Sequence, residues 1–270
     1  MIVPAPAGPE ETVITIDLSG KHAVVMGVAN HRSLSWAIAQ QLHRAGAALC
    51  LTYAGERLRA DVEELASRLP GTLTLDCDVT EDRAISAVAR RLHREWGSVE
   101  CLVHGIAFAR KQDLEGKFVA TSREGFQIAL EISAYSLLNV THHLLPLLER
   151  HGASIVTLSY LAAERAVPNY NVMGSAKAVL EQSVRQLAWE LGPKEIRVNA
   201  ISAGPVSTLA ARGVHGFVGM LRHHAERAPL RRNITREEVG SAGLFLLSDL
   251  SSGITGETLY VDAGYHVMGL

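Results

Sequence analysis

The feature that most constrains the fold is a regular alternation of short apolar runs with longer amphipathic segments. The runs are rich in β-branched residues and end at small or polar residues, which is typical of buried strands. The segments between them have helical periodicity, as over 56–69, 81–96, 123–148, 169–191 and 237–247. Strands joined through helices run parallel, and a parallel sheet needs helices on both faces. We therefore predict an α/β fold with a doubly wound sheet of about seven strands, over 21–27, 48–53, 72–77, 101–104, 153–158, 197–201 and 258–261.

Composition favours one globular domain. The chain has 270 residues, of which 47% are hydrophobic and 20% charged, and its net charge is -2. We predict a flexible tail over 1–16, rich in proline and alanine, and a single domain over 17–270. Near-neutral charge without a long basic run argues against nucleic-acid binding. The N-terminus lacks a basic region, and no stretch of about 18 apolar residues occurs, which argues against a signal peptide and a membrane span.

The three cysteines indicate a reducing compartment. Cys50, Cys77 and Cys101 are odd in number, lie in or beside predicted strands and form no CxxC pair. This pattern favours reduced core thiols over a disulfide framework or a zinc site. We predict a cytoplasmic protein without a metal site.

Two phenols and an ammonium group follow the strand over 153–158. Tyr160 lies where this strand ends, and Pro168 suits the start of a helix, which would place Tyr170 in the first turn. Lys177 lies about two turns further on, so Tyr170 and Lys177 are predicted to face one cleft. We expect the cation to favour the phenolate and make Tyr170 a better proton donor. Packing plus a solvated charge also produces such a pair, so the interpretation depends on other motifs.

The turn after the first strand suits a pyrophosphate. Gly27 permits a sharp turn into a helix whose free N–H groups, near Ser33 and Leu34, attract an anion. At the end of the third strand, Asp78 can accept a hydrogen bond from an adenine amine while Val79 packs against the ring. Asp78 has a second interpretation, as the N-cap of the following helix. These residues predict a dinucleotide site of the Rossmann type.

Two turns of small residues extend this prediction. Ile106 lies in the turn after the fourth strand, where a flat ring can approach the backbone. After the sixth strand, backbone groups near Val206 could hold a carboxamide and Thr208 could reach a phosphate. Ordinary glycine and proline turns are the alternative. The second strand ends without an acid or an adjacent arginine, and Arg57 is expected on a helix surface, so we predict NADH rather than NADPH.

Five sequence blocks occur in a family-specific order, namely GVANHRSLSWAIA, LSY, PNYNVMGSAK, RVNAISAGPV and GITGETLYVDAGY. Over about Asp17 to Tyr265 the chain resembles the short-chain dehydrogenase/reductase superfamily. Within it, the chain resembles the bacterial NADH-dependent enoyl-acyl-carrier-protein reductases. The spacing Tyr170-x6-Lys177, with Tyr160 ahead, distinguishes this branch from the commoner Tyr-x3-Lys pattern.

The resemblance implies NADH-dependent reduction of the trans-2 double bond of an enoyl thioester on acyl carrier protein, in fatty acid biosynthesis, by a cytoplasmic homotetramer. Tyr170 would stabilise the developing enolate, Lys177 would hold the nicotinamide ribose, and Tyr160 and Ala109 would lie beside the substrate. The dinucleotide contacts would come from Lys177 and from Gly27, Ser33, Leu34, Asp78, Val79, Ile106, Val206, Ser207, Thr208, Leu209 and Ala210.

A mobile lid is expected over 207–229. Its apolar members would line an acyl channel or pack as a surface helix, and they are Leu209, Val214, Phe217 and Leu221. Its basic members would face an acidic carrier protein or only solvent, and they are Arg212, His215, Arg222, His223, His224 and Arg227. Two departures from the family stand out: Ala54 replaces a polar residue, and Gly105 replaces a common serine, which should alter the pocket wall.

Two rival functions follow from the same fold. A 3-oxoacyl or other carbonyl reductase would place a serine such as Ser159 ahead of a Tyr-x3-Lys motif, which this chain lacks. A non-catalytic dinucleotide sensor would not need Tyr160, Tyr170 and Lys177 together.

Overall fold

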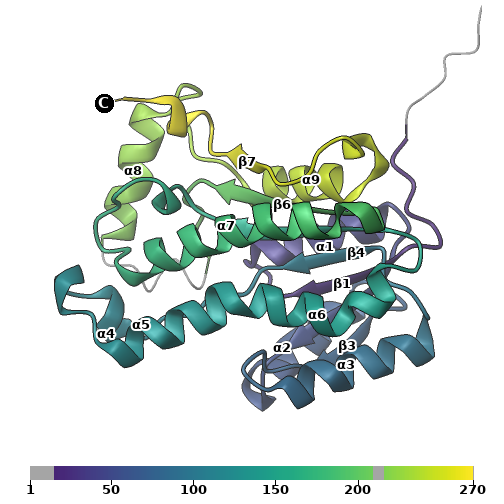
Figure 1. Ribbon diagram of the computed structural model, residues 1–270. Coiled ribbons are helices and arrows are strands. Elements are labelled where there is room, and N and C mark those ends of the chain that lie inside the picture. The colour runs from purple at the N-terminus through teal and green to yellow at the C-terminus, as the bar shows by residue number, and fades with distance from the viewer. Residues whose placement is uncertain (1–14, 209–215, 270) are drawn as a thin grey trace, which may run out of the picture.

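A single seven-stranded parallel sheet forms the centre of the protein (Figure 1). The computed structural model describes residues 15–208 and 216–269. The strand order is β3-β2-β1-β4-β5-β6-β7, so the doubly wound sheet predicted from the sequence is confirmed. The strands are β1 (His22–Met26), β2 (Ala48–Tyr53), β3 (Leu73–Asp76), β4 (Cys101–His104), β5 (Ala153–Ser159), β6 (Ile196–Ala203) and β7 (Thr258–Val261).

Helices cover both faces of the sheet. One buried cluster joins the strands to α1, α2 and α9, and the other joins them to α3, α6 and α7. Figure 1 shows α3, α6 and α7 in front of the sheet, with α1 and α9 behind it. The helices are α1 (Leu34–Arg44), α2 (Glu56–Ser67), α3 (Asp82–Glu95), α4 (Lys111–Leu114), α5 (Arg123–Leu130), α6 (Ser136–Leu148), α7 (Val172–Leu191), α8 (Phe217–Arg227) and α9 (Arg236–Leu247).

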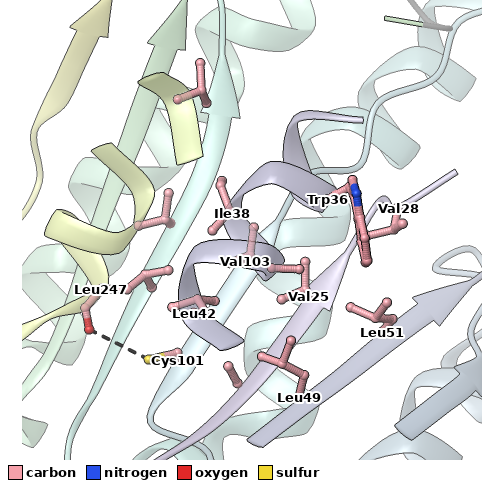
Figure 2. Close-up of a cluster of buried hydrophobic side chains, with 14 of the residues drawn as sticks. Val25, Val28, Trp36, Ile38, Leu42, Leu49, Leu51, Cys101, Val103 and Leu247 are labelled. Atoms are coloured by element: carbon pink, nitrogen blue, oxygen red, sulfur yellow. Dashed lines mark hydrogen bonds between the residues drawn. The ribbon is translucent and has the colours of Figure 1, made fainter. Parts of the chain in front are cut away.

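Helix α1 is held against the sheet by fully buried side chains. Ile38 and Leu42 of α1 belong to the same cluster as Val25 of β1, Leu51 of β2 and Val103 of β4 (Figure 2). Close packing of this kind leaves little freedom for either element to shift. The cluster therefore fixes the N-terminus of α1 relative to the ends of β1 and β4.

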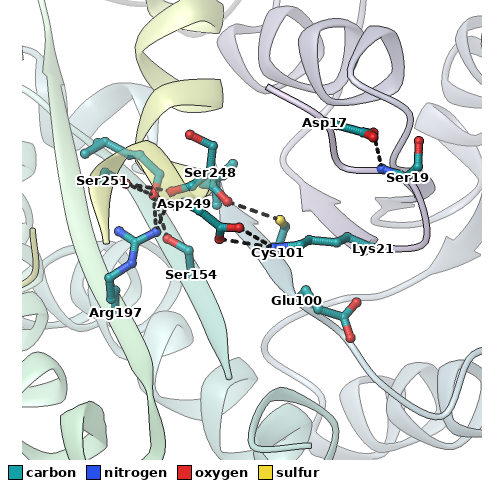
Figure 3. Close-up of polar contacts among 12 residues, drawn as sticks. Asp17, Ser19, Lys21, Glu100, Cys101, Ser154, Arg197, Ser248, Asp249 and Ser251 are labelled. Atoms are coloured by element: carbon teal, nitrogen blue, oxygen red, sulfur yellow. Dashed lines mark hydrogen bonds and ion pairs between the residues drawn. The ribbon is translucent and has the colours of Figure 1, made fainter. Parts of the chain in front are cut away.

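Polar contacts hold the chain together at the amino ends of the strands (Figure 3). Lys21 pairs with Asp249 at 3.1 Å. Arg197 donates to the carbonyl oxygens of Leu246 at 2.9 Å and Ser248 at 3.1 Å. These bonds satisfy backbone groups where the chain leaves α9. These contacts lie away from the carboxyl ends of the strands, where ligands of such sheets bind.

The structure refines the sequence prediction in two segments. The helix expected over 123–148 contains a π-helical turn, Glu131–Tyr135, between α5 and α6. One wide turn hardly changes the apolar periodicity, so the sequence does not reveal it. The predicted lid over 207–229, whose sequence is less regular than the other helical segments, contains the helix α8. Residues 1–14 of the predicted tail lie outside the described residues, as do 209–215 of the predicted lid.

The cysteines are free and buried, as predicted. Burial raises the pKa of each of the three thiols to about 12, which keeps them protonated. Over the described residues, no helix combines the length and the apolar character needed to cross a membrane.

Candidate functional site

The site begins where the strand order reverses, between β1 and β4. Met26 and His104 are register partners at the ends of these strands, and the Gly105 N–H donates to the Met26 carbonyl at 3.2 Å. Gly27 adopts φ +86°, and a Cβ there would lie 2.1 Å from the Gly105 carbonyl oxygen. Only glycine fits at position 27. The backbone at Gly27 and Gly105, which carries no side chains, therefore forms the floor of the site. Ligands of open α/β sheets bind at this switch point.

A cavity of about 600 Å³ opens above this floor. It reaches from the end of β2, at Thr52 and Tyr53, to Lys177 of α7. The structure brings most of the predicted dinucleotide residues into its lining, namely Gly27, Ser33, Leu34, Asp78, Val79, Ile106, Lys177 and Thr208.

Of the predicted dinucleotide residues that the structure describes, Val206 and Ser207 do not line this cavity. Val206 lines a neighbouring cavity, and Ser207 is exposed between the two without lining either. Leu209 and Ala210 lie outside the described residues.

The N-terminus of α1 faces the cavity without a capping side chain among the described residues. Ser33 occupies the N-cap position, but its hydroxyl oxygen accepts the N–H groups of Ala29 at 3.0 Å and Asn30 at 3.2 Å. The hydroxyl thus shapes the turn after Gly27 and leaves the first N–H groups of the helix open. An open helix N-terminus attracts anions such as a pyrophosphate.

At the end of the cavity near β2 and β3, the structure differs from the sequence-based interpretations of Asp78 and Arg57. Asp78 accepts from the N–H of Thr80 at 2.9 Å, and Glu81 is the N-cap of α3, so the interpretation of Asp78 as an N-cap is wrong. Arg57 is exposed, as expected, yet it also lines the cavity beside Ala54. The sequence reading assigned Arg57 only to the helix surface, because periodicity does not show that the first turn of α2 borders a cavity.

Tyr170 lies before α7 and not in its first turn, which contradicts the sequence prediction. The helix begins at Val172, because Asn169 and Asn171 adopt left-handed backbone angles, with φ of 64° and 40°. Asparagine tolerates this conformation better than most residues. Tyr170 and Lys177 nevertheless line the same cavity, as predicted.

Two phenols lie side by side, of which Tyr170 lines this cavity and Tyr160 packs against Tyr170. The ring centroids of Tyr160 and Tyr170 are 4.9 Å apart. Burial raises the pKa of Tyr160 to about 12, and burial together with the neighbouring phenol raises the pKa of Tyr170 further. The expected lowering of the Tyr170 pKa by Lys177 is therefore wrong, because burial and the neighbouring Tyr160 phenol both raise it. Both side chains are protonated donors at neutral pH.

Lys177 is only 5% exposed, and its Nζ donates to the Leu158 carbonyl at 2.6 Å. Burial lowers the pKa of this ammonium to about 8, while the nearby Glu181 raises it. Glu181 in turn accepts the Ser159 hydroxyl at 2.5 Å. The Ser159 proton is thus directed away from the cavity.

A second, mainly apolar cavity of about 500 Å³ shares Tyr170 and Ser159 with the first. It brings together the three predicted substrate residues, Ala109, Tyr160 and Tyr170. Its apolar wall also includes Phe108, Leu114, Met173, Phe217 and Met220.

Two residues that contact the walls of these cavities, Ser133 and Met220, were missed by sequence reasoning. Ser133, in the π-helical turn, accepts the Phe108 N–H at 2.9 Å and donates to its carbonyl at 3.1 Å. Met220 accepts the Tyr160 hydroxyl at 3.4 Å. Nothing in the apolar pattern indicates either contact, because both join segments far apart in the chain.

The basic members of the predicted lid divide into two groups. Arg222, His223 and Arg227 are exposed on α8. His224 is buried and stacks on Tyr265, so it does not face a partner as expected. The remaining apolar and basic members, Val214, Arg212 and His215, lie outside the described residues.

The donors and acceptors of the first cavity fit a dinucleotide. An open helix N-terminus suits its pyrophosphate, a carboxylate and an apolar side chain suit adenine, and a buried ammonium suits ribose hydroxyls. The profile of one protein family, described as enoyl-(acyl carrier protein) reductase, matches residues 27–266. The chain belongs to this family. Its predicted membership of the short-chain dehydrogenase/reductase superfamily is confirmed with it.

Similar proteins support the assignment to the enoyl-(acyl carrier protein) reductases. Enoyl-[acyl-carrier-protein] reductase [NADH] FabI of Bacillus cereus is 54% identical over 254 residues, covering 93% of this chain and 99% of the relative. The solved structure of the Bacillus cereus reductase with NADP+ and indole naphthyridinone has a TM-score of 0.92 and 54% identity, and covers 94% of this chain and 99% of that one. The Anaplasma phagocytophilum reductase, solved with NAD, has a TM-score of 0.90 and 47% identity, and covers 94% and 96%.

Proposed function

We propose that this protein is an NADH-dependent enoyl-acyl-carrier-protein reductase of fatty acid biosynthesis. The observation that carries the proposal is the wall shared by the two cavities. Tyr170 borders both the cavity that holds Lys177 and the apolar cavity that holds Ala109. An acyl chain in the apolar cavity would present its thioester to the phenols beside a nicotinamide in the other. The substrate is an enoyl thioester carried on acyl carrier protein.

When bound, NADH would supply a hydride for the β-carbon of the double bond, and a tyrosine or water would supply the proton for the α-carbon. Between these two additions, negative charge develops on the thioester oxygen. Tyr170 donates a hydrogen bond to that oxygen, and its raised pKa keeps the proton in place until charge develops. A preorganised donor of this kind contributes about 3 to 4 kcal/mol to catalysis. Tyr160 packs against Tyr170 at 4.9 Å and lies beside the acyl group.

We assign the dinucleotide contacts to residues of the first cavity and its rim. Lys177 holds the nicotinamide ribose hydroxyls and adds positive potential near the thioester. The remaining contacts come from Gly27, Ser33, Leu34, Asp78, Val79, Ile106 and the run 206–210.

The segment 207–229 is proposed to cover the acyl chain and to gate its entry. Phe217 and Met220 of α8 support this proposal, because both line the apolar cavity. Exposed Arg222 and Arg227 on the same helix present positive charge to an acidic carrier protein. We propose that the rest of the single domain, which begins at residue 17, stays fixed when the lid moves.

We further propose a cytoplasmic homotetramer. Large apolar side chains are exposed on neighbouring α6 and α7, including Leu138, Val179 and Trp189, which is 77% exposed. Exposed apolar residues on one face favour contact with another copy of the chain. Three buried free thiols accord with a reducing compartment. Sedimentation is expected to give four chains, and a monomer would contradict this proposal.

The loss of NADH absorbance with thioester substrates tests the proposed reaction. We expect turnover with crotonyl and longer enoyl thioesters and none with 3-oxoacyl thioesters. Turnover with 3-oxoacyl thioesters alone would indicate a carbonyl reductase, and tight NADH binding without any turnover would indicate a sensor. The Ser159 hydroxyl, donated to Glu181, argues against the carbonyl reductase.

A further inference from the structure

The dinucleotide cavity contains a hydroxyl group without a hydrogen-bond partner. Ser35, the second residue of α1, is 1% exposed and belongs to the cavity lining. Its Oγ has no partner within residues 15–208 and 216–269. A buried hydroxyl without a partner is unfavourable, so its retention at a binding surface indicates that a ligand supplies the partner.

Ser35 Oγ fills space that a side chain at position 105 would otherwise occupy. A Cβ at Gly105 would lie 1.9 Å from Ser35 Oγ, far inside contact distance, while the next obstacle, the Met26 carbonyl oxygen, is 3.0 Å away. A side chain at position 105 would therefore clash with the Ser35 hydroxyl in the rotamer that the structure shows. Both positions can carry a side-chain hydroxyl only if Ser35 leaves this rotamer.

We propose that the Ser35 hydroxyl donates a hydrogen bond to a pyrophosphate oxygen of the dinucleotide and that Gly105 makes room for it. The inference depends on the proposed use of NADH. The open N-terminus of α1 attracts the pyrophosphate to this place. The oxygen of Ser33 already accepts two backbone N–H groups, whereas the Ser35 oxygen is unengaged. Ser35 is thus a cofactor-binding residue in addition to those assigned above.

Titration of the protein with NADH, followed by fluorescence, tests the proposal without relying on turnover. Ser35→Ala is expected to bind NADH about tenfold more weakly, because a hydrogen bond to a charged oxygen is lost. ADP-ribose, which keeps the pyrophosphate, should lose affinity by the same factor. AMP, which lacks the pyrophosphate, should bind both proteins equally. A loss confined to NADH would overturn the assignment to the pyrophosphate.

A buried serine at the other end of the sheet provides the control. The Ser251 hydroxyl donates to the carbonyls of Leu246 at 2.9 Å and Ser248 at 3.0 Å. Ser251→Ala should lower the thermal stability of the protein without ligand and leave the Kd for NADH unchanged. Ser35→Ala should show the reverse pattern, with stability retained and NADH affinity reduced. Reduced stability together with unchanged affinity in Ser35→Ala would mean a purely structural role.

A double-mutant cycle tests the clash between the two positions. Gly105→Ser alone is expected to lower both stability and NADH affinity, because its Cβ meets Ser35 Oγ. Adding Ser35→Ala removes the clash and places the hydroxyl on the opposite side of the wall. The double variant should therefore bind NADH more tightly than either single variant. Additive losses in the double variant would overturn the proposal.

The wild-type protein separates this proposal from the proposed function. If wild type fails to bind NADH, the proposed function itself is wrong. If wild type binds NADH and Ser35→Ala binds it with the same Kd, only the role of Ser35 is wrong.

Discussion

Lys177 and Leu158 are joined by a hydrogen bond of 2.6 Å from the buried ammonium to a backbone carbonyl. The bond ties α7 to the end of β5 and fixes where the positive charge enters the cavity. Burial acts on both sides of this site, because it lowers the pKa of Lys177 and raises that of Tyr170.

The affinity for NADH is expected to fall as the pH rises through about 8. The lowered pKa of Lys177, about 8, means that the ammonium loses its proton in this range, and with it a charged donor to the ribose. Isothermal titration of NADH across this range measures the effect. Lys177→Arg, whose guanidinium stays charged, should bind with little pH dependence. Equal pH dependence in both proteins would contradict the role of Lys177.

The stability of the protein without ligand should change with pH in the opposite direction. The folded chain lowers the Lys177 pKa from 10.5 to about 8, so between these values the unfolded chain binds more protons. The free energy of unfolding is therefore expected to gain a contribution from Lys177 as the pH rises from about 8 toward 10.5. Urea unfolding of wild type and Lys177→Met measures it. The gain should be absent from the variant.

Arg57 is expected to matter for NADPH and not for NADH. It lines the cavity at the end of β2, where an arginine can hold a 2′-phosphate. Wild type should prefer NADH, and Arg57→Gln should lower kcat/KM for NADPH about tenfold while changing that for NADH less than about twofold. Arg59 is the matched control, since it pairs with Glu56 and Glu63 on the same helix. An NADPH loss of similar size in Arg59→Gln would contradict the assignment.

Glu238 should stabilise the start of α9. Its carboxylate accepts the Thr235 N–H at 2.7 Å and pairs with Arg232 at 2.6 Å, while its own N–H donates to the Thr235 hydroxyl. Glu238→Gln is expected to cost about 1 kcal/mol in urea unfolding at neutral pH. The neighbouring Glu237→Gln should cost much less, because Glu237 only approaches Arg236 at 4.0 Å.

The contribution of the Glu238 carboxylate to the free energy of unfolding should be lost in acid. Hydrogen bonds from Arg232 and the Thr235 backbone lower the pKa of Glu238 to about 2, from an ordinary 4.5. Its contribution is complete above about 4.5 and is lost as the pH falls toward 2. The difference in stability between wild type and Glu238→Gln should shrink over that range, and a constant difference would exclude this account.

Sequence reasoning captured the fold because each strand of a parallel sheet is an apolar run that a helix must follow. It also placed Tyr160, Tyr170 and Lys177 around one site, since all three lie near the carboxyl end of β5 or in the helix after it. It missed the start of α7, because two asparagines adopt left-handed angles that no apolar pattern encodes.

The predicted lowering of the Tyr170 pKa by Lys177 was wrong for a related reason. The sequence predicts that Lys177 and Tyr170 face one cavity, but the sign of a pKa shift depends on how deeply each group is buried. The close approach of Ser35 to Gly105 was also beyond reach, because it arises where α1 meets the turn after β4. The substitution of Gly105 for a common serine was visible, but its partner at position 35 was not.

The Tyr170 phenol is expected to stabilise the charge that develops on the thioester during reduction. The most direct test compares NADH oxidation with crotonyl thioester by wild type and Tyr170→Phe, together with the Kd of each for NADH. We predict turnover lowered by about 100- to 1,000-fold, with the Kd within about twofold of wild type. Wild-type turnover in Tyr170→Phe would contradict the account.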